Sequence, residues 1–431
     1  MKRVLCTAVA AALLGSAGSA FAITDSETNA SIPFSFSSPG ARSLGMAGAF
    51  LGLADDATAA YTNPAGLTQL VQTEVSLEAR HTSYSTPYID GGSASISPFS
   101  SSGLNISDAD SSNTNPSYLS IVIPHDRWSF AFYRHELARF DTDFATLNGA
   151  DVGDFRLFPF RSIADLKIVS FGAAAAFKAT DNVSLGLGLT RYDFRFDTAT
   201  VRVDDINPQN ITIASRQFQN GDDNAYGFNV GARFRLSDQL SLGATYRKAP
   251  RFDYKAINVL YNDVDGNPLP QPELFSSFNK VRFDVPDIFG VGLSWRPIDT
   301  LVVNFDLDRV MYSQLTDNVN TLFDIQGAAN HLYLEDGTEA HLGAEYTFAN
   351  MAAPFSVRAG FWHDPRHSVA FKGTPADATQ AVLATLFAGG RGAENHVSVG
   401  GGWAFKRFQL DFGADLSDGL DTYSVSGVYR F

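Results

Sequence analysis

The side chains of this 431-residue chain that could carry out acid–base or metal chemistry are numerous but scattered. Its 8 histidines lie in no Gly-x-Ser-x-Gly or His-Glu-x-x-His context, whereas hydrolysis needs a positioned nucleophile and base. The single cysteine is Cys6, which excludes a disulfide framework and a cysteine-ligated metal site. We therefore predict no catalytic residues, no metal site and no cofactor.

Residues suited to binding an apolar or acidic molecule gather in two segments that we expect to be exposed loops. Segment 155–161 is rich in phenylalanine and arginine, and segment 255–285 could supply the opposite wall. Exposed apolar side chains are typical of binding surfaces, and an arginine among them could attract a carboxylate. Alternatively, the same residues only pack the loops into a cap. The candidate ligand-binding residues are Phe155, Arg156, Phe158, Phe160, Arg161 and Phe275.

The elements that must position these residues are strands. From about Glu74 onward, runs of alternating apolar and polar residues recur, each followed by a turn or a loop. The runs, about fourteen in all, lie near 73–86, 116–124, 127–139, 166–179, 182–196, 224–236, 239–254, 286–296, 300–313, 338–350, 354–363, 394–405, 407–417 and 420–431. An even strand number closes bacterial outer-membrane barrels. We predict an all-β fold, a transmembrane antiparallel β-barrel of about 14 strands.

Connection lengths support the same fold. His125-Asp126 and Thr180-Asp181 mark tight turns, and short and long connections alternate almost throughout. In outer-membrane barrels the short turns face the periplasm and the long loops face outside. The predicted long loops lie near 87–115, 140–165, 197–223, 255–285, 314–337 and 364–393.

The two faces of the predicted strands also differ as a barrel requires. Leu185, Leu187 and Leu189 alternate with Gly186 and Gly188. The leucine face suits lipid, and the glycine face suits a polar lumen.

Both ends of the chain indicate export to the outer membrane of a Gram-negative bacterium. Residues 1–22 have a basic start, a short apolar run and a small-x-small cleavage pattern, as a signal peptide does. The terminal Phe431 resembles the signal that barrel-assembly machinery recognises. We expect a monomer in contact with outer-membrane lipid and lipopolysaccharide. The net charge of -14 argues against a nucleic-acid partner.

Residues 23–72 do not alternate, and their many small side chains would pack tightly inside a lumen. The segment contains Gly40–Phe50, an Ala-Asp-Asp-Ala stretch at 54–57 and an Asn-Pro-Ala-Gly motif. With a second match that runs from Val285 to Asp306, these motifs resemble the FadL/TodX family of outer-membrane transporters for long-chain fatty acids and aromatic hydrocarbons. The resemblance covers nearly the whole chain beyond the signal peptide. The motif residues are Asn63, Pro64, Ala65 and Gly66.

The resemblance implies a barrel over 73–431 closed by an N-terminal hatch, or plug, over 23–72. It also implies passive uptake of a hydrophobic ligand, which outer loops capture and the lumen holds. The ligand then leaves sideways through a gap at a kink in the third strand, against which the hatch motif packs.

The third predicted strand gives its own reason to expect such a gap. Trp128, Phe130 and Phe132 share the lipid-facing parity, so Arg134 would follow them on that face. A lipid-facing arginine near mid-membrane costs about 2–4 kcal/mol. A bulge near Tyr133 that turned Arg134 inward would remove this cost, and we expect the lateral opening there. Alternatively, Arg134 extends to the outer headgroups.

Three arginines, Arg233, Arg247 and Arg358, fall on inward positions beside acidic residues. We expect most of them to be paired, but one could hold a carboxylate head group. The sequence does not say which, nor does it separate fatty acids from aromatic hydrocarbons. The main alternative function is a general or purely structural porin, although a plug over 23–72 argues against an open pore. An outer-membrane enzyme has less support.

Overall fold

The computed structural model describes residues 38–97, 99–205, 211–262, 268–316, 331–389 and 392–431, together with Phe34, Phe36 and Gln209. The predicted signal peptide and the first part of the predicted hatch lie outside these residues. Within them, no helix has the length and apolar character needed to cross a membrane.

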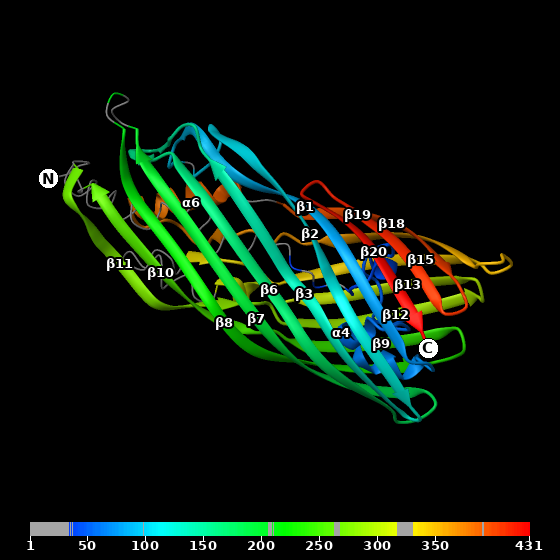
Figure 1. Ribbon diagram of the computed structural model, residues 1–431. Helices are drawn as coiled ribbons and strands as arrows, with labels where there is room; N and C mark the ends of the chain where they lie inside the picture. Colours follow the sequence, from blue (N-terminus) through cyan, green and yellow to red (C-terminus); the bar gives the residue numbers. More distant parts are fainter. Residues whose placement is uncertain are drawn as a thin grey trace.

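Fourteen antiparallel strands form a closed barrel, which confirms the predicted fold (Figure 1). In ring order they are β1 (Glu74–Ala94), β2 (Leu104–His125), β3 (Trp128–Ala145), β6 (Phe160–Lys178), β7 (Val183–Asp204), β8 (Thr212–Arg235), the interrupted strand β9 (Leu240–Lys248) and β10 (Arg251–Asn262), the interrupted strand β11 (Pro268–Asp284) and β12 (Ile288–Ile298), β13 (Leu301–Val310), β15 (Gly337–Phe348), β16 (Phe355–Asp364), β18 (Glu394–Ala404), β19 (Phe408–Leu416) and β20 (Leu420–Arg430). Pairing of β1 with β20 closes the ring.

The strands reach much further toward the loops than the sequence predicts. Most of the predicted loops 87–115, 140–165, 197–223 and 255–285 are extended strand. The connection between β3 and β6 retains a small hairpin, β4 (Ala150–Val152) with β5 (Phe155–Leu157). The other long connections contain η3 (Tyr312–Thr316), β14 (Leu332–Tyr333), β17 (Ala370–Phe371), the short helix α6 (Ala378–Leu386) and η5 (Phe387–Gly389).

The barrel has two halves of opposite polarity, and β7 shows the change. In the half next to the short turns, Leu185, Leu187 and Leu189 point outward and are each at least 50% exposed. Beyond Arg191, the long-loop half begins, and its first outward residues, Asp193, Arg195 and Asp197, are charged. Its inward residues include Phe194, which is 2% exposed.

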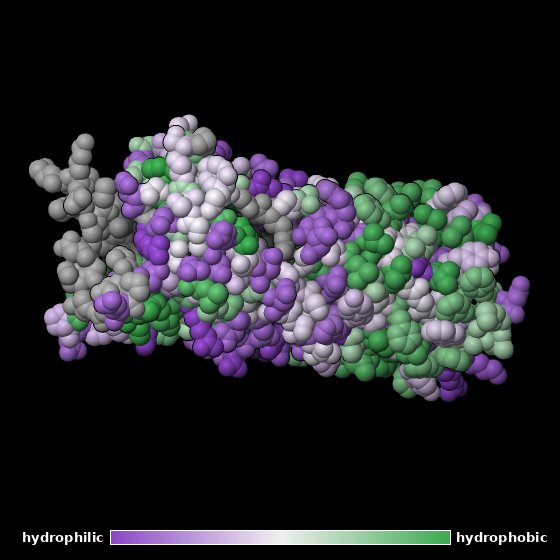
Figure 2. Space-filling model, turned by 90° about the horizontal axis from the view of Figure 1, so that it is seen from above, coloured by the Kyte–Doolittle hydropathy of each residue, from purple (hydrophilic) through white to green (hydrophobic). Residues whose placement is uncertain are grey.

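The hydropathy of the surface follows this division. Apolar residues gather over the half of the barrel that carries the short turns and the C-terminus, whereas polar residues cover much of the other half in this view (Figure 2). The apolar half is the band expected to contact lipid.

The hatch segment, here Ser38 to Gln72, lies in the lumen of the short-turn half and contains α3 (Ala41–Leu44), α4 (Ala59–Thr62) and η2 (Pro64–Gln69). The carboxylate of Asp306 on β13 accepts hydrogen bonds from two N–H groups of this segment, those of Phe50 (2.5 Å) and Leu51 (2.7 Å). On β9, a Cβ at Gly243 would lie 2.0 Å from the Leu51 carbonyl oxygen. The inward glycines therefore permit close backbone packing.

Candidate functional site

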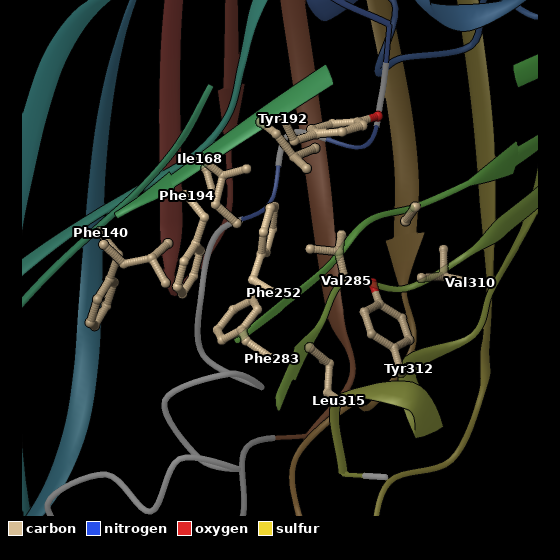
Figure 3. Close-up of a cluster of buried hydrophobic side chains, with 14 of the residues drawn as sticks. Phe140, Ile168, Tyr192, Phe194, Phe252, Phe283, Val285, Val310, Tyr312 and Leu315 are labelled. Atoms are coloured by element: carbon tan, nitrogen blue, oxygen red, sulfur yellow. The ribbon is translucent and has the colours of Figure 1, made fainter. Parts of the chain in front are cut away.

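Large apolar side chains fill the lumen of the long-loop half. Side chains from β3, β6, β7, β10, β11 and η3 point toward one another (Figure 3). Phe194 stacks on Phe252 with ring centroids 4.6 Å apart and lies 5.2 Å from Phe283. We define the upper aromatic cluster as Phe140, Tyr192, Phe194, Phe196, Phe252, Tyr254, Phe283 and Tyr312, all of them buried.

Segments from outside the strands cover this cluster. Helix α6 packs Val382 and Leu386 into the same apolar core. Phe34 and Phe36, which fall within the predicted hatch (23–72), stack on each other at 5.0 Å. Phe36 also approaches Tyr312 at 6.4 Å. The cluster is thus enclosed by the wall, by a loop helix and by the N-terminal chain.

The lower end of the cluster is polar. Tyr61 of the hatch segment lies 4.2 Å, ring to ring, from His135 of β3. Arg247 of β9 donates to the Tyr61 hydroxyl (3.0 Å) and to the Phe36 carbonyl oxygen (3.1 Å). Neither ring nitrogen of the fully buried His135 has a hydrogen-bond partner among the described residues. Buried polar groups without partners are uncommon, so this floor is a candidate contact for a ligand's polar group.

The wall of the barrel is interrupted between β2 and β3. Their ladder runs from His125–Trp128 to Tyr118–His135 and ends there. Beyond that pair, β2 remains paired with β1, and β3 remains paired with β6 up to Ala145. Each strand therefore presents a free edge in the long-loop half. The gap begins at the upper border of the apolar band.

The irregularity in β3 lies at Leu137 and not near Tyr133. The register between β3 and β6 shifts between Glu136 and Ala138, but the strand itself continues. Tyr133 is inward, where its hydroxyl bonds to that of Thr190 at 2.7 Å. This bulge exchanges the two faces of β3, so that Phe140 points into the upper aromatic cluster.

The expectation that Arg134 turns inward is wrong. Arg134 precedes the bulge and keeps the outward parity, with 22% of its side chain exposed. Its guanidinium donates to the Pro116 carbonyl oxygen on the free edge of β2 and to Glu136 at 3.3 Å. Arg134 lies at the top of the apolar band, where these two bonds stabilise its charged guanidinium. The side chain therefore does not need to turn into the lumen.

Side chains bridge the gap in place of the missing ladder. The Tyr84 hydroxyl of β1 donates to the Asp141 carbonyl oxygen and accepts from the Asp141 N–H, both at 2.6 Å. Its ring stacks on Phe140 at 5.4 Å. Asn113 of β2 donates to the Arg139 carbonyl oxygen at 3.3 Å. These bonds hold the edges together without a continuous sheet.

A second interruption lies between β8 and the broken strand β9 and β10. The ladder between β8 and β9 ends at the pair Phe228–Lys248. Pairing of β8 resumes with β10 at Asn220–Lys255. Between these pairs, the Asp223 carboxylate accepts a bond from the Asp253 N–H at 2.8 Å.

The hatch motif packs mainly against β6, β7 and β8. Asn63 caps η2, accepts from the Ala65 N–H (3.3 Å) and donates to the Leu51 (3.0 Å) and Ala232 (3.3 Å) carbonyl oxygens. A Cβ on Gly186 of β7 would lie 2.3 Å from the Ala65 nitrogen. The motif residues Pro64, Ala65 and Gly66 are buried. Tyr61 of the hatch segment lies nearer the β3 bulge, with its ring 4.2 Å from that of His135 and tilted by 44°.

The three lumenal arginines have different surroundings. Arg358 forms ion pairs with Glu345 (2.6 Å) and Asp411 (2.8 Å), so its role is structural. Arg233 donates to the Ser241 hydroxyl at 2.9 Å near the short turns, remote from the aromatic cluster. Among the three, Arg247 alone touches the floor of the cluster.

The two loop arginines already have acidic partners. Arg156 pairs with Asp205 (2.5 Å) and Asp151 (3.1 Å). Arg161 points outward and pairs with Asp143 at 2.8 Å.

The predicted loop aromatics that can be placed are buried. Phe158 and Phe160 are 6% and 5% exposed. They line a small pocket together with the cationic side chain of Arg202. The side chains of Phe155 and Phe275 lie outside the described part of the structure.

Sequence reasoning missed Arg202, His135 and Tyr84. The available signal was the second alternation on β7, where Tyr192, Phe194 and Phe196 continue the period after the leucines but on the opposite parity. Arg202 lies on that same inward series.

Comparisons with known proteins agree with this architecture. The chain is similar to the toluene transporter TodX of Pseudomonas putida, with 16% identity, TM-score 0.61, and coverage of 92% of this chain and 99% of that chain. It is also similar to the toluene transporter TbuX of Ralstonia pickettii (14% identity, TM-score 0.57, the same coverage). The monoaromatic hydrocarbon channel CymD gives 16% identity and TM-score 0.58, also with 92% and 99% coverage. These likenesses show the fold.

A search among curated proteins finds no match. The family model described as outer membrane protein transport protein (OMPP1/FadL/TodX) matches residues 24–415. That family consists of transport channels and not of enzymes, and its members are outer-membrane barrels of Gram-negative bacteria. The chain therefore belongs to the OMPP1/FadL/TodX family of outer-membrane transport proteins.

Proposed function

We propose that this protein is a passive channel for hydrophobic compounds, either long-chain fatty acids or aromatic hydrocarbons. The observation that carries the proposal is the enclosed aromatic cluster in the long-loop half, directly above a lumen filled by the hatch segment. Burying an apolar ligand among such side chains is favourable by about 25 cal/mol per Å². A water-filled pore would instead need a polar lining at this level.

The proposed route has three stages. The ligand binds under the loop between β3 and β6, moves into the upper aromatic cluster, and leaves sideways between β2 and β3. Three features support this exit: the ladder ends at His135, the bulge turns Phe140 toward the cluster, and only side-chain bonds close the gap. The exit faces the upper border of the lipid-facing band, where an apolar compound can enter the membrane.

The floor of the cluster supplies a polar end for the ligand. Arg247 has no ion pair among the described residues, and its Nε has no partner. A carboxylate or a hydroxyl at this position would satisfy Arg247 or His135. We propose Arg247, and neither Arg233 nor Arg358, as the lumenal arginine that contacts ligand.

A general porin is the second candidate, and conductance distinguishes the two. The hatch segment occupies the lumen, so we expect only small, infrequent currents from the purified protein in planar bilayers. Deletion of the protein should reduce uptake of hexadecanoate or an alkylbenzene by cells and leave uptake of a small sugar unchanged. Steady large currents, or equal loss of sugar uptake, would favour the porin.

A further inference from the structure

Arg202 is a buried cation without a carboxylate partner in the described part of the chain. Arg202 is 4% exposed, and its guanidinium donates a hydrogen bond to the Phe158 carbonyl oxygen at 3.2 Å. The guanidinium carbon lies 4.9 Å from the ring centroid of Phe160. The nearby loop arginines, Arg156 and Arg161, have acidic partners instead.

This arrangement is electrostatically incomplete. Burial lowers the pKa of Arg202 to about 9, which leaves the guanidinium charged at neutral pH. A buried ion without a counter-ion carries a large desolvation cost. One carbonyl oxygen and one aromatic face compensate only part of it. An anion that reaches Arg202 would supply the missing charge through charge-assisted hydrogen bonds.

A pocket gives access to the Arg202 side chain. Its walls are largely apolar, and the lining residues are Ile89, Thr146, Asn148, Ala150, Leu157, Phe158, Phe160 and Arg202. The free interior is about 10 Å³, which accommodates one water-sized group. It therefore suits a carboxylate oxygen, while an attached apolar chain would lie along the walls outside it.

The position of Arg202 on β7 links this pocket to the proposed route. Arg202 and Phe196 lie on the same inward series of β7, six residues apart along the strand. At a rise of about 3.3 Å per residue, they are separated by roughly 20 Å. A molecule held by its head group at Arg202 can thus extend its chain toward the upper aromatic cluster.

We propose that Arg202 is a head-group site for hydrophobic carboxylates at the outer end of the lumen. The site selects acids carrying a long apolar chain over neutral compounds of the same shape. This inference rests on the proposed function, because it assumes that apolar compounds enter beneath the loop between β3 and β6.

Calorimetric titration of the purified protein in a non-ionic detergent, with dodecanoate and dodecanol as matched ligands, tests the site. We expect Arg202→Met to weaken dodecanoate binding about tenfold or more, which corresponds to 1.4 kcal/mol, and to leave dodecanol binding unchanged. Arg195→Met is the matched control, because Arg195 lies on the same strand but on the outward face. It should change neither affinity.

A second variant covers the case in which Arg202→Met fails to fold. Asn148→Asp is nearly isosteric and places a carboxylate in the same pocket, where it would compete with the ligand for Arg202. It should weaken dodecanoate binding and spare dodecanol.

Unchanged dodecanoate affinity in a folded Arg202→Met or Asn148→Asp variant would overturn the proposal. Equal loss for both ligands in Arg202→Met would also overturn it, because packing rather than charge would then explain the effect. If the unmodified protein bound neither ligand, the proposed function would fail with it.

Discussion

The two halves of β7 follow the same alternation but serve opposite environments. Near the short turns, the outward leucines contact the lipid region and the inward glycines allow the hatch segment to approach. Just beyond Arg191, the outward Asp193, Arg195 and Asp197 are charged, whereas the inward residues 192, 194 and 196 are aromatic. The strand continues without interruption, but its apolar side chains face outward in the short-turn half and inward in the long-loop half.

The comparison shows that one barrel can combine a membrane anchor and a ligand site by inverting its polarity. The inversion occurs near the rung that joins Tyr133, Gly172 and Thr190 across β3, β6 and β7. The β2–β3 ladder ends two residues further along β3, at His135. The gap between β2 and β3 therefore begins at the level where the outer surface of the barrel changes from apolar to polar and the lumen changes from polar to apolar.

The largest expected effect comes from truncating an inward residue of the long-loop half. Phe194→Ala removes a buried ring stacked on Phe252, and such changes typically cost about 3–5 kcal/mol. Leu189→Ala is the control on the outward face of the other half, where lipid can fill the space. Urea unfolding in lipid vesicles checks this, and equal losses would contradict the inversion.

The second-largest effect is expected from a charge introduced on the outward face of β7, which should destabilise the short-turn half and not the long-loop half. We expect Leu187→Arg to cost about 2–4 kcal/mol, because it places a cation in the lipid-facing band. Ala199→Arg, on the same outward series beyond Arg191, should have little effect. The same unfolding measurement applies. Comparable destabilisation by both would mean that the band extends along the whole strand.

The polar lumen of the short-turn half can be tested at Asp306. Removing its carboxylate leaves the Phe50 and Leu51 N–H groups without their acceptor, at a cost of about 1–3 kcal/mol. We expect Asp306→Ala to loosen the hatch segment and to increase the frequency of ion currents in planar bilayers. Asp306→Asn keeps an acceptor and should restore most of the seal. Identical currents for all three proteins would contradict the anchoring role.

The smallest predicted change in stability concerns Tyr84. Tyr84→Phe keeps the ring on Phe140 but removes both bonds to Asp141, and each ordinary hydrogen bond contributes about 0.5–1.5 kcal/mol. Amide hydrogen exchange at Asp141 should accelerate, as should release of a bound alkylbenzene. Tyr88→Phe, further along β1, is the control. No change in either rate would show that Tyr84 does not hold the gap.

The sequence predicts the parts of the fold that depend on the lipid-facing pattern. All fourteen runs correspond to strands of the barrel, because outward apolar residues alternate clearly in the short-turn half. The sequence predicts loops where the barrel strands continue beyond these runs, because the clear alternation of lipid-facing residues ends there. The predicted run 182–196 already includes Tyr192, Phe194 and Phe196, but its continuation to Asp204 follows only from the knowledge that these residues surround a second apolar interior.

The site was less accessible from the sequence. Arg134 marks the level of the gap, but the bulge at Leu137 depends on how β3 pairs with β6. Partners of charged side chains also depend on distant strands: Arg358 meets Asp411, whereas Arg202 meets no carboxylate among the described residues. Periodicity gives the face of a residue and not its neighbours.

Linking the free edges of β2 and β3 would test the lateral route most directly. The chain beyond Cys6 has no cysteine, so Asn113→Cys with Arg139→Cys can be joined through two disulfide bonds by a short bis-methanethiosulfonate cross-linker, which a reductant cleaves. The control pair, Ser83→Cys with Ser112→Cys, links β1 and β2 within an intact ladder. The account predicts that the first link blocks transfer of an alkylbenzene or hexadecanoate into the membrane until it is reduced, and that the second has no effect. Undiminished transfer through the barrel with the β2–β3 gap linked would contradict it.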